Sequence, residues 1–281
     1  MSAVCAGFFF ASGKPVLYLI QSTIINSRFL FLLIFIPFGV MGIFSSLIIA
    51  SAISVLFAIC VLYHYGVRFQ LPKKKFLIDT FHYSISNYFS DCFLAAPVFI
   101  IPVMIFLIEG EKDTALYSVS YAVASVTFLI PTAIGYALFM SGCQKKITIQ
   151  SMKMKICAIM SLLVVIIILF SLLGKNLVNL LGPDYSGTEN LIVIIMISSI
   201  FALFFQVFSA EFKIFRQVRK LLLLNFVFFV TIMSMSYFLI VNKGLNGAGY
   251  AWIAAYAICV IPLICYRLFN KKHIFSNEIS S

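Results

Sequence analysis

Residues 155–175 read KICAIMSLLVVIIILFSLLGK, a run of apolar side chains between two lysines. Such a run matches the ~20 apolar residues that a helix needs to cross the hydrocarbon core of a bilayer. Similar stretches recur along the rest of the chain, and together they predict eight membrane-spanning helices. Their predicted bounds are 15–36, 40–62, 77–107, 114–141, 156–174, 189–210, 221–241 and 247–267.

The composition agrees with a membrane protein. The 281 residues are 63% hydrophobic and only 10% charged, and the mean hydropathy of +1.10 excludes a soluble domain. Because backbone exposed to lipid must satisfy its own hydrogen bonds, the predicted fold class is an all-α polytopic bundle. The long stretch 77–107 carries Pro97 and Pro102, which predict a kink or an interfacial segment before the span.

Basic residues alternate between the gaps that separate these stretches. Sixteen of the twenty Lys and Arg residues lie in every second gap, while the other gaps hold most of the acidic residues. Cytoplasmic loops retain Lys and Arg, so the pattern predicts that both termini are cytoplasmic. The charges are dispersed over short loops, which anionic membrane lipid explains, and no nucleic-acid partner is predicted.

An internal repeat links the two ends of the chain. A shift of 205 positions places residues 48–60 on residues 253–265 and Gly39 and Gly42 on Gly244 and Gly247. Two helices that are alike only in composition remain an alternative. Because both copies run from outside to inside, the repeat is parallel, which is an architecture of transporters.

The repeat predicts two parts. Residues 76–281 would form a complete half of six spans, and residues 1–75 would be the last two spans of an earlier half. The same shift puts the expected start of that earlier half roughly 130 residues before Met1.

Charged residues inside apolar spans are costly and by default mark a transport pathway or an ion pair. Arg28 follows Asn26, and Asp91 follows Asn87; we predict these four residues as a substrate-binding set. Counting along each helix puts Arg28 and Asp91 roughly 20 Å from the cytoplasmic side, beyond the midplane.

Several interpretations of these charges stay open. Arg28 could attract an anionic substrate in a cavity, pair with Asp91, or extend to an interface if the span is misplaced. Asp91 could serve transport, as a counter-ion or in proton coupling, or form a structural hydrogen bond within the bundle.

Other polar residues predict less. Glu211, Lys213 and Arg216 are interpreted as a solvated loop cluster, and Asn225 as a contact between helices. Three tyrosines are assigned to an interfacial belt, with a cavity lining as the alternative: Tyr117, Tyr121 and Tyr136. The loops are too short to carry a catalytic domain and hold no enzyme motif, so no enzyme is predicted. The seven cysteines form no CxxC pair, and neither a metal nor another cofactor is predicted.

Several segments, in this order and spacing, resemble one family. They are Ser90-Asp91, Asp113-x-x-x-Tyr117-Ser-x-x-Tyr121-Ala, Phe128-x-x-Pro131, Leu181-Gly182-Pro-Asp-Tyr185 and Gly244-Leu-Asn-Gly247-Ala-Gly249. They resemble Wzx-type O-antigen flippases of the multidrug/oligosaccharidyl-lipid/polysaccharide flippase superfamily. The resemblance covers essentially the whole chain.

The resemblance implies a transporter of about twelve spans in two parallel halves around a cationic cavity. It implies an undecaprenyl-diphosphate-linked oligosaccharide as the substrate, flipped across the bacterial inner membrane during O-antigen or capsule assembly. Other polysaccharide-assembly membrane proteins would be partners. The first four spans of the family pattern are absent from the sequence, so residues 1–281 alone are expected not to restore O-antigen in a flippase-null host. A multidrug-type antiporter and a non-transporting remnant or accessory subunit remain alternatives.

Overall fold

The computed structural model describes residues 15–27, 31, 35, 39–65, 74–143, 149–181, 185 and 187–270. Over these residues the chain forms helices joined by turns, and no strand is present among them. The prediction of an all-α membrane bundle is confirmed, with seven helices in the described part long and apolar enough to cross a membrane. The chain divides into two units, Met1–Lys74 and Lys75–Ser281.

The first unit contains α2 (Pro15–Asn26) and α4 (Gly39–His64). The two helices pack against each other around Leu17, Ala58 and Leu62. Helix α4 covers the predicted span 40–62. The predicted span 15–36 lies partly outside the described residues, and α2 covers its beginning.

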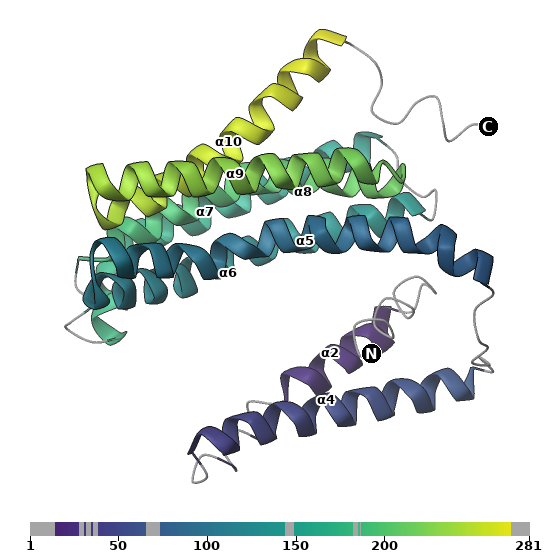
Figure 1. Ribbon diagram of the computed structural model, residues 1–281. Helices are drawn as coiled ribbons and strands as arrows, with labels where there is room; N and C mark the ends of the chain where they lie inside the picture. Colours follow the sequence, from purple (N-terminus) through teal and green to yellow (C-terminus); the bar gives the residue numbers. More distant parts are fainter. Residues whose placement is uncertain are drawn as a thin grey trace. The chain divides into compact units, whose positions relative to one another are not determined.

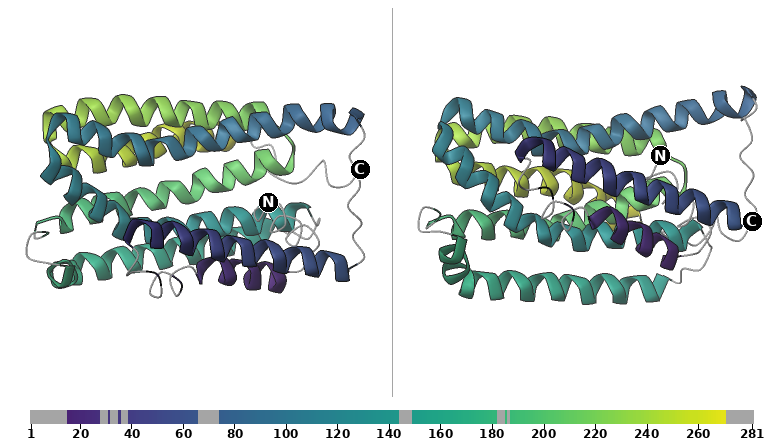
Figure 2. Two further views of the ribbon diagram at one scale, coloured as in Figure 1. Left: turned by 60° about the horizontal axis from the view of Figure 1, so that its bottom comes forward. Right: turned by 90° about the horizontal axis from the view of Figure 1, so that it is seen from below.

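The second unit consists of six helices that run side by side (Figure 1). They are α5 (Lys74–Ile108), α6 (Glu111–Cys143), α7 (Ile149–Leu181), α8 (Glu189–Ile214), α9 (Val218–Lys243) and α10 (Leu245–Asn270). Helix α8 contacts α6, α7, α9 and α10 and runs through the middle of this unit (Figure 2). It is therefore the central helix, and the hydrophobic core of the unit is built around it.

Small residues allow the close contacts of α8. A Cβ atom on Gly135 of α6 would lie 3.1 Å from Oε1 of Gln206, and one on Gly249 of α10 would lie 2.9 Å from Cγ2 of Ile194. Glycine at such positions lets helix backbones approach each other, as is typical of membrane bundles. Helix α7, by contrast, exposes large apolar residues such as Leu162, Leu169 and Leu172, which suit contact with lipid.

The prolines act differently in two helices. Helix α5 continues through Pro97 and Pro102 as one curved helix rather than two segments (Figure 1). Its first residues, 74–83, precede the apolar part that begins at Ser84. Helix α10 contains Pro262, and its C-terminal part turns away from α9 (Figure 1), because proline removes a backbone hydrogen bond and bends a helix.

The paired glycines of the sequence repeat have the same backbone roles. Gly39 and Gly244 both have positive φ, +57° and +60°, immediately before or at the start of α4 and α10. A Cβ on Gly42 would lie 2.0 Å from the carbonyl oxygen of Phe35, and one on Gly247 would lie 2.1 Å from that of Leu239. Each helix therefore begins with a turn that only glycine fits, in agreement with the 205-residue shift.

The two ends of the second unit differ in charge. One end, here called the basic end, carries Lys213, Arg216, Arg219, Lys220 and Arg267, where α8 and α10 finish and α9 begins. The other, here called the acidic end, carries Glu109, Glu111, Asp113 and Glu189, and also Lys112 and Lys243, around the α5–α6 turn, the start of α8 and the end of α9. A cytoplasmic basic end remains a prediction from the loop charges.

Candidate functional site

A buried hydrogen-bonded contact joins α5 to α9 beside Asp91. The Asn225 side chain donates from Nδ2 to the Ser90 carbonyl oxygen at 3.0 Å and to Ser90 Oγ at 2.8 Å. Both residues are buried, and Phe93 packs nearby against Phe226 and Phe229. The interpretation of Asn225 as a contact between helices is confirmed. Its own Oδ1 is buried without a hydrogen-bond partner.

Asp91 forms a loose ion pair with a lysine of α8. Lys213 Nζ lies 3.9 Å from Asp91 Oδ1, and the two side chains are 33% and 65% exposed. Asn225, which bonds the neighbouring Ser90, lies about 10 Å along α9 from the basic end at 1.5 Å per residue. Asp91 is therefore in the half of the bundle nearer the basic end, and the predicted depth beyond the midplane is wrong. Helix α5 begins well before its apolar part, so counting from its start overestimated the depth.

A second ion pair at the same end is less exposed. The Arg267 guanidinium of α10 donates from Nη2 to Glu211 Oε2 of α8, and the side chains are only 21% and 14% exposed. The guanidinium also lies over the Phe208 ring, 4.4 Å from its centroid. The interpretation of Glu211 and Lys213 as a solvated loop cluster is wrong. Helix α8 extends to Ile214, and each residue pairs with a different neighbouring helix.

The four predicted substrate-binding residues fall in different parts of the chain. Asn87 is partly buried one turn before Asp91, on the same face of α5. Asn26 is the last residue of α2, in the first unit. Arg28 lies outside the described residues. The structure thus places Asn87 and Asp91 on one face of α5 and pairs Asp91 with Lys213. A pair between Arg28 and Asp91 stays a hypothesis.

Aromatic side chains fill the middle of the second unit. Trp252 of α10 donates from Nε1 to the Tyr117 hydroxyl of α6 at 3.0 Å, and Tyr121 stacks on both rings. The cluster continues through Phe128, Phe205, Phe228 and Tyr256. Tyr117 is 1% exposed, so the interfacial-belt interpretation is wrong for Tyr117 and Tyr121, whereas Tyr136 is exposed.

An apolar groove opens where α10 turns away from α9. Its volume is about 300 Å³, and Lys220 is its only charged lining residue. The other lining residues are Phe212, Leu223, Leu224, Val227, Ile258, Cys259, Pro262 and Leu263. The turn of α10 at Pro262 creates this groove next to the basic end.

Sequence patterns alone did not pair these charges. Glu211 and Arg267 both lie at the ends of apolar stretches, and this position was the only indication of their role in the sequence. Their pairing could not be predicted because it depends on which helices are neighbours. Within the described ranges, no cluster of His, Cys, Asp and Glu is arranged to hold a metal ion.

Replacing Asn225 with alanine is expected to lower the stability of the second unit by about 1 kcal/mol, because Ser90 loses its donor. The loss is limited because the unpaired Oδ1 disappears as well. The measurement is the thermal midpoint of the purified protein in detergent. Asn242→Ala is the matched control, since Asn242 is exposed and bonds only the Phe238 carbonyl of its own helix. Equal midpoints for the two variants would show that Asn225 does not hold α5.

Two solved structures of MATE proteins have a similar arrangement of helices. The chain is similar to the outward-facing structure of a multidrug resistance MATE family transporter of the MOP superfamily, with a TM-score of 0.78 and 13% identity over 99% of this chain and 67% of that one. It is also similar to the crystal structure of a MATE mutant, with a TM-score of 0.75 and 14% identity over 96% of this chain and 65% of that one. The chain thus spans about two thirds of the length of both. No family model matches the sequence, and no curated protein is significantly similar to it.

At these identities the likeness concerns the fold. The chain is a multi-span membrane protein with the fold of the MATE transporters.

Proposed function

We propose that this chain belongs to a membrane transporter that flips an undecaprenyl-diphosphate-linked oligosaccharide, a repeat unit of O-antigen or capsule, across the bacterial inner membrane. The observation that supports a transporter is the fold that this chain shares with MATE structures. The proposed orientation places the basic end in the cytoplasm, next to anionic lipid. Membrane lipid and other polysaccharide-assembly membrane proteins are the proposed partners.

The two ion pairs at the basic end favour an anionic headgroup. The Asp91–Lys213 pair is long and partly exposed, so it contributes at most about 1 kcal/mol and is easily exchanged. A diphosphate carries more charge than one carboxylate and would compete with Asp91 for the Lys213 ammonium. Arg267 is less exposed and already bound to Glu211, so Lys213 is the more available cation.

Within this proposal, Asn26, Arg28, Asn87 and Asp91 form the substrate-binding set. Asp91 and Asn87 lie on one face of α5, where Asp91 meets Lys213. Arg28 would add a further cation for the diphosphate. Asn26 and Asn87 would bind its oxygens or the first sugar through their amide groups.

A multidrug antiporter is the second candidate, since one structural neighbour is named as a multidrug resistance transporter. A lipophilic cation needs an accessible carboxylate. Of the carboxylates near the basic end, Asp91 and Glu211 already face a cation. A cationic drug would therefore have to displace Lys213 or Arg267 from these carboxylates.

Disruption of the gene that encodes this chain tests the two candidates together. The flippase proposal expects loss of surface polysaccharide and accumulation of the lipid-linked repeat unit, both reversed by the intact gene. The antiporter candidate expects normal polysaccharide and a lower minimum inhibitory concentration of cationic dyes. Normal polysaccharide with unchanged dye resistance would contradict both proposals.

Asp91→Asn in the restored gene is expected to lower surface polysaccharide at least tenfold without unfolding the protein, because Lys213 then lacks the carboxylate that would displace the bound diphosphate and release it. The exposed ion pair contributes little to stability, so the thermal midpoint should stay close to that of the unchanged protein. Lys213→Met is expected to do the same, and Asn242→Leu is the neutral control. Normal polysaccharide in both charge variants would remove Asp91 and Lys213 from the substrate path.

A further inference from the structure

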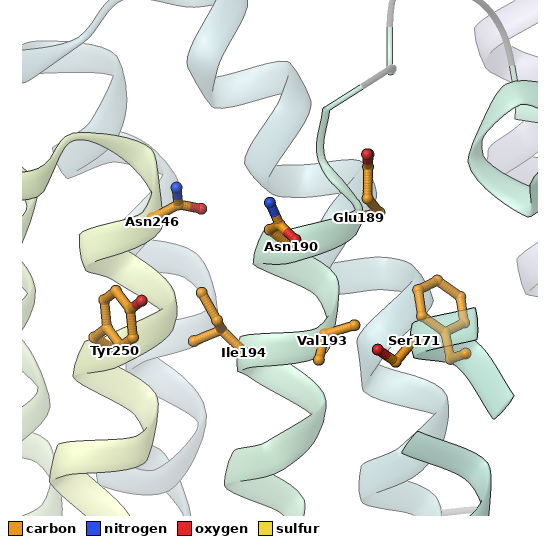
Figure 3. Close-up of a pocket in the computed structure, with 8 residues that line it drawn as sticks. Ser171, Glu189, Asn190, Val193, Ile194, Asn246 and Tyr250 are labelled. Atoms are coloured by element: carbon orange, nitrogen blue, oxygen red, sulfur yellow. The ribbon is translucent and has the colours of Figure 1, made fainter. Parts of the chain in front are cut away.

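A polar pocket lies at the acidic end of the second unit, away from the two ion pairs of the basic end. Its volume is about 340 Å³, and it is formed by α7, α8 and α10 (Figure 3). Its lining residues are Phe170, Ser171, Glu189, Asn190, Val193, Ile194, Asn246 and Tyr250. The volume is at the lower end of the range for small-molecule sites, about 300–1,000 Å³, and suits a ligand of one or two rings.

The side chains of the pocket are arranged on two levels. Asn246, Asn190 and Glu189 lie next to one another along the rim, and Tyr250, Ile194, Val193 and Ser171 lie on the level below (Figure 3). The floor between α8 and α10 is tight, because a Cβ on Gly249 would meet Ile194 and Leu191. The two helices therefore present the polar rim from a packed base.

The rim carboxylate and the tyrosine are both held in place. Glu189 Oε2 accepts a hydrogen bond from the Gly187 backbone N–H at 2.8 Å, and Gly187 has a φ of +94°. Lys243 Nζ lies 5.0 Å from the centroid of the Tyr250 ring. The carboxylate keeps further lone pairs for a ligand, since each carboxylate can accept several hydrogen bonds.

The chemistry of the lining matches a neutral polyhydroxylated ring. Two amide side chains offer donors and acceptors together, a carboxylate accepts from hydroxyl groups, and Ser171 and Tyr250 add hydroxyls. None of the eight lining residues is Lys or Arg, so an anionic ligand has no counter-ion in the lining. Glu189 and the Phe170 ring would also suit a lipophilic cation, but such a ligand makes no use of the Asn190 and Asn246 amides, and it is therefore included in the test as a competitor.

We propose that this pocket is a saccharide-binding site for one or two uncharged sugar rings at the acidic end of the bundle. The assignment to an external site rests on the proposed function, in which the acidic end faces away from the cytoplasm. There the pocket would receive the sugar headgroup after it has crossed the membrane. The site lies within the second unit and needs no contribution from α2 or α4.

The test uses the full chain in phosphatidylcholine nanodiscs, without sugar detergents, and saturation-transfer NMR with N-acetylglucosamine and lactose. Binding of at least one of these sugars in the millimolar range is expected. The double variant Asn190→Leu with Asn246→Leu should weaken it at least tenfold, because both rim amides are lost. The matched control Asn242→Leu, at the same end but outside the pocket, should bind like the unchanged protein.

Three results would overturn the site: no transfer to either sugar, equal binding by the double variant and the unchanged protein, or displacement of the sugar by tetraphenylphosphonium. The thermal midpoint of the double variant, measured in parallel, shows that lost binding is not lost folding. A polyprenyl-linked disaccharide in the same nanodisc shows whether the natural ligand is a lipid-linked sugar or a soluble one. Displacement of the free sugar assigns the pocket to the transported headgroup, and no displacement assigns it to a soluble saccharide.

The sugar-binding result and the gene-disruption result can be told apart. If the protein binds no sugar but the disrupted strain lacks surface polysaccharide, only the proposal of the saccharide pocket is contradicted. If the protein binds sugar but the disrupted strain has normal surface polysaccharide, the flippase proposal is contradicted and the saccharide pocket is supported.

Discussion

Replacing Gly247 with alanine is expected to destabilise the second unit by about 3 kcal/mol, at the upper end of the cost of overpacking. The added Cβ would lie 2.1 Å from the Leu239 carbonyl oxygen and 2.3 Å from its carbon. Both are backbone atoms of α9, so no side-chain rotation relieves the clash. Gly244, three residues earlier in the same turn, adopts φ +60° and ψ −148°, a conformation that is essentially restricted to glycine.

The thermal midpoint in detergent measures this effect, followed by size-exclusion chromatography after heating. Gly249→Ala is the control, because its Cβ would meet only side-chain atoms of Ile194 and Leu191, at 2.9 Å or more, and should therefore cost less. Gly42→Ala should destabilise the first unit in the same way, since its Cβ would lie 2.0 Å from the Phe35 carbonyl oxygen. Similar midpoints for Gly247→Ala and Gly249→Ala would refute the tight α9–α10 turn.

Removal of one partner of the Glu211–Arg267 pair is expected to cost about 2–3 kcal/mol. Arg267→Met keeps most of the side-chain volume but leaves the Glu211 carboxylate partly buried without its partner. It also removes the stacking on Phe208. The effect should exceed that of Lys213→Met, because the Asp91–Lys213 pair is more exposed and its atoms are farther apart.

A double-mutant cycle separates the pair from its surroundings. Glu211→Leu combined with Arg267→Met should be more stable than Arg267→Met alone, because no unpaired charge then remains in the bundle. The four thermal midpoints of the cycle measure the coupling. Strictly additive effects would mean that the two side chains do not stabilise each other.

The positions of the helices could be predicted from the sequence, because the length of an apolar stretch and the charge of a loop are properties of consecutive residues. The span predicted at 189–210 begins where α8 begins, and the repeat placed Gly39 and Gly244 at equivalent turns. Helix ends were underestimated: α7 extends from Ile149 to Leu181, beyond the predicted 156–174. Polar residues at an interface remain helical, although they are not apolar enough to be counted in a span.

The candidate site was less predictable because it depends on which helices are neighbours and how each is rotated. Asp91 was found from its cost in a membrane, but its partner Lys213 lies 122 positions away in a different helix. The α7–α8–α10 pocket combines Ser171, Asn190 and Asn246, each unremarkable in its own segment. The interfacial-belt prediction for Tyr117 and Tyr121 was wrong because an interfacial tyrosine and a core tyrosine occupy similar positions along a helix.

Trp252 is the only tryptophan of the chain, and its indole is buried against Tyr117, Tyr121 and Phe228. All tryptophan emission therefore originates from one point, where α6, α9 and α10 meet. A separation of these helices would admit water to the indole and shift the emission to longer wavelength. The bundle thus carries an intrinsic optical reporter of its own opening, and no dye has to be attached.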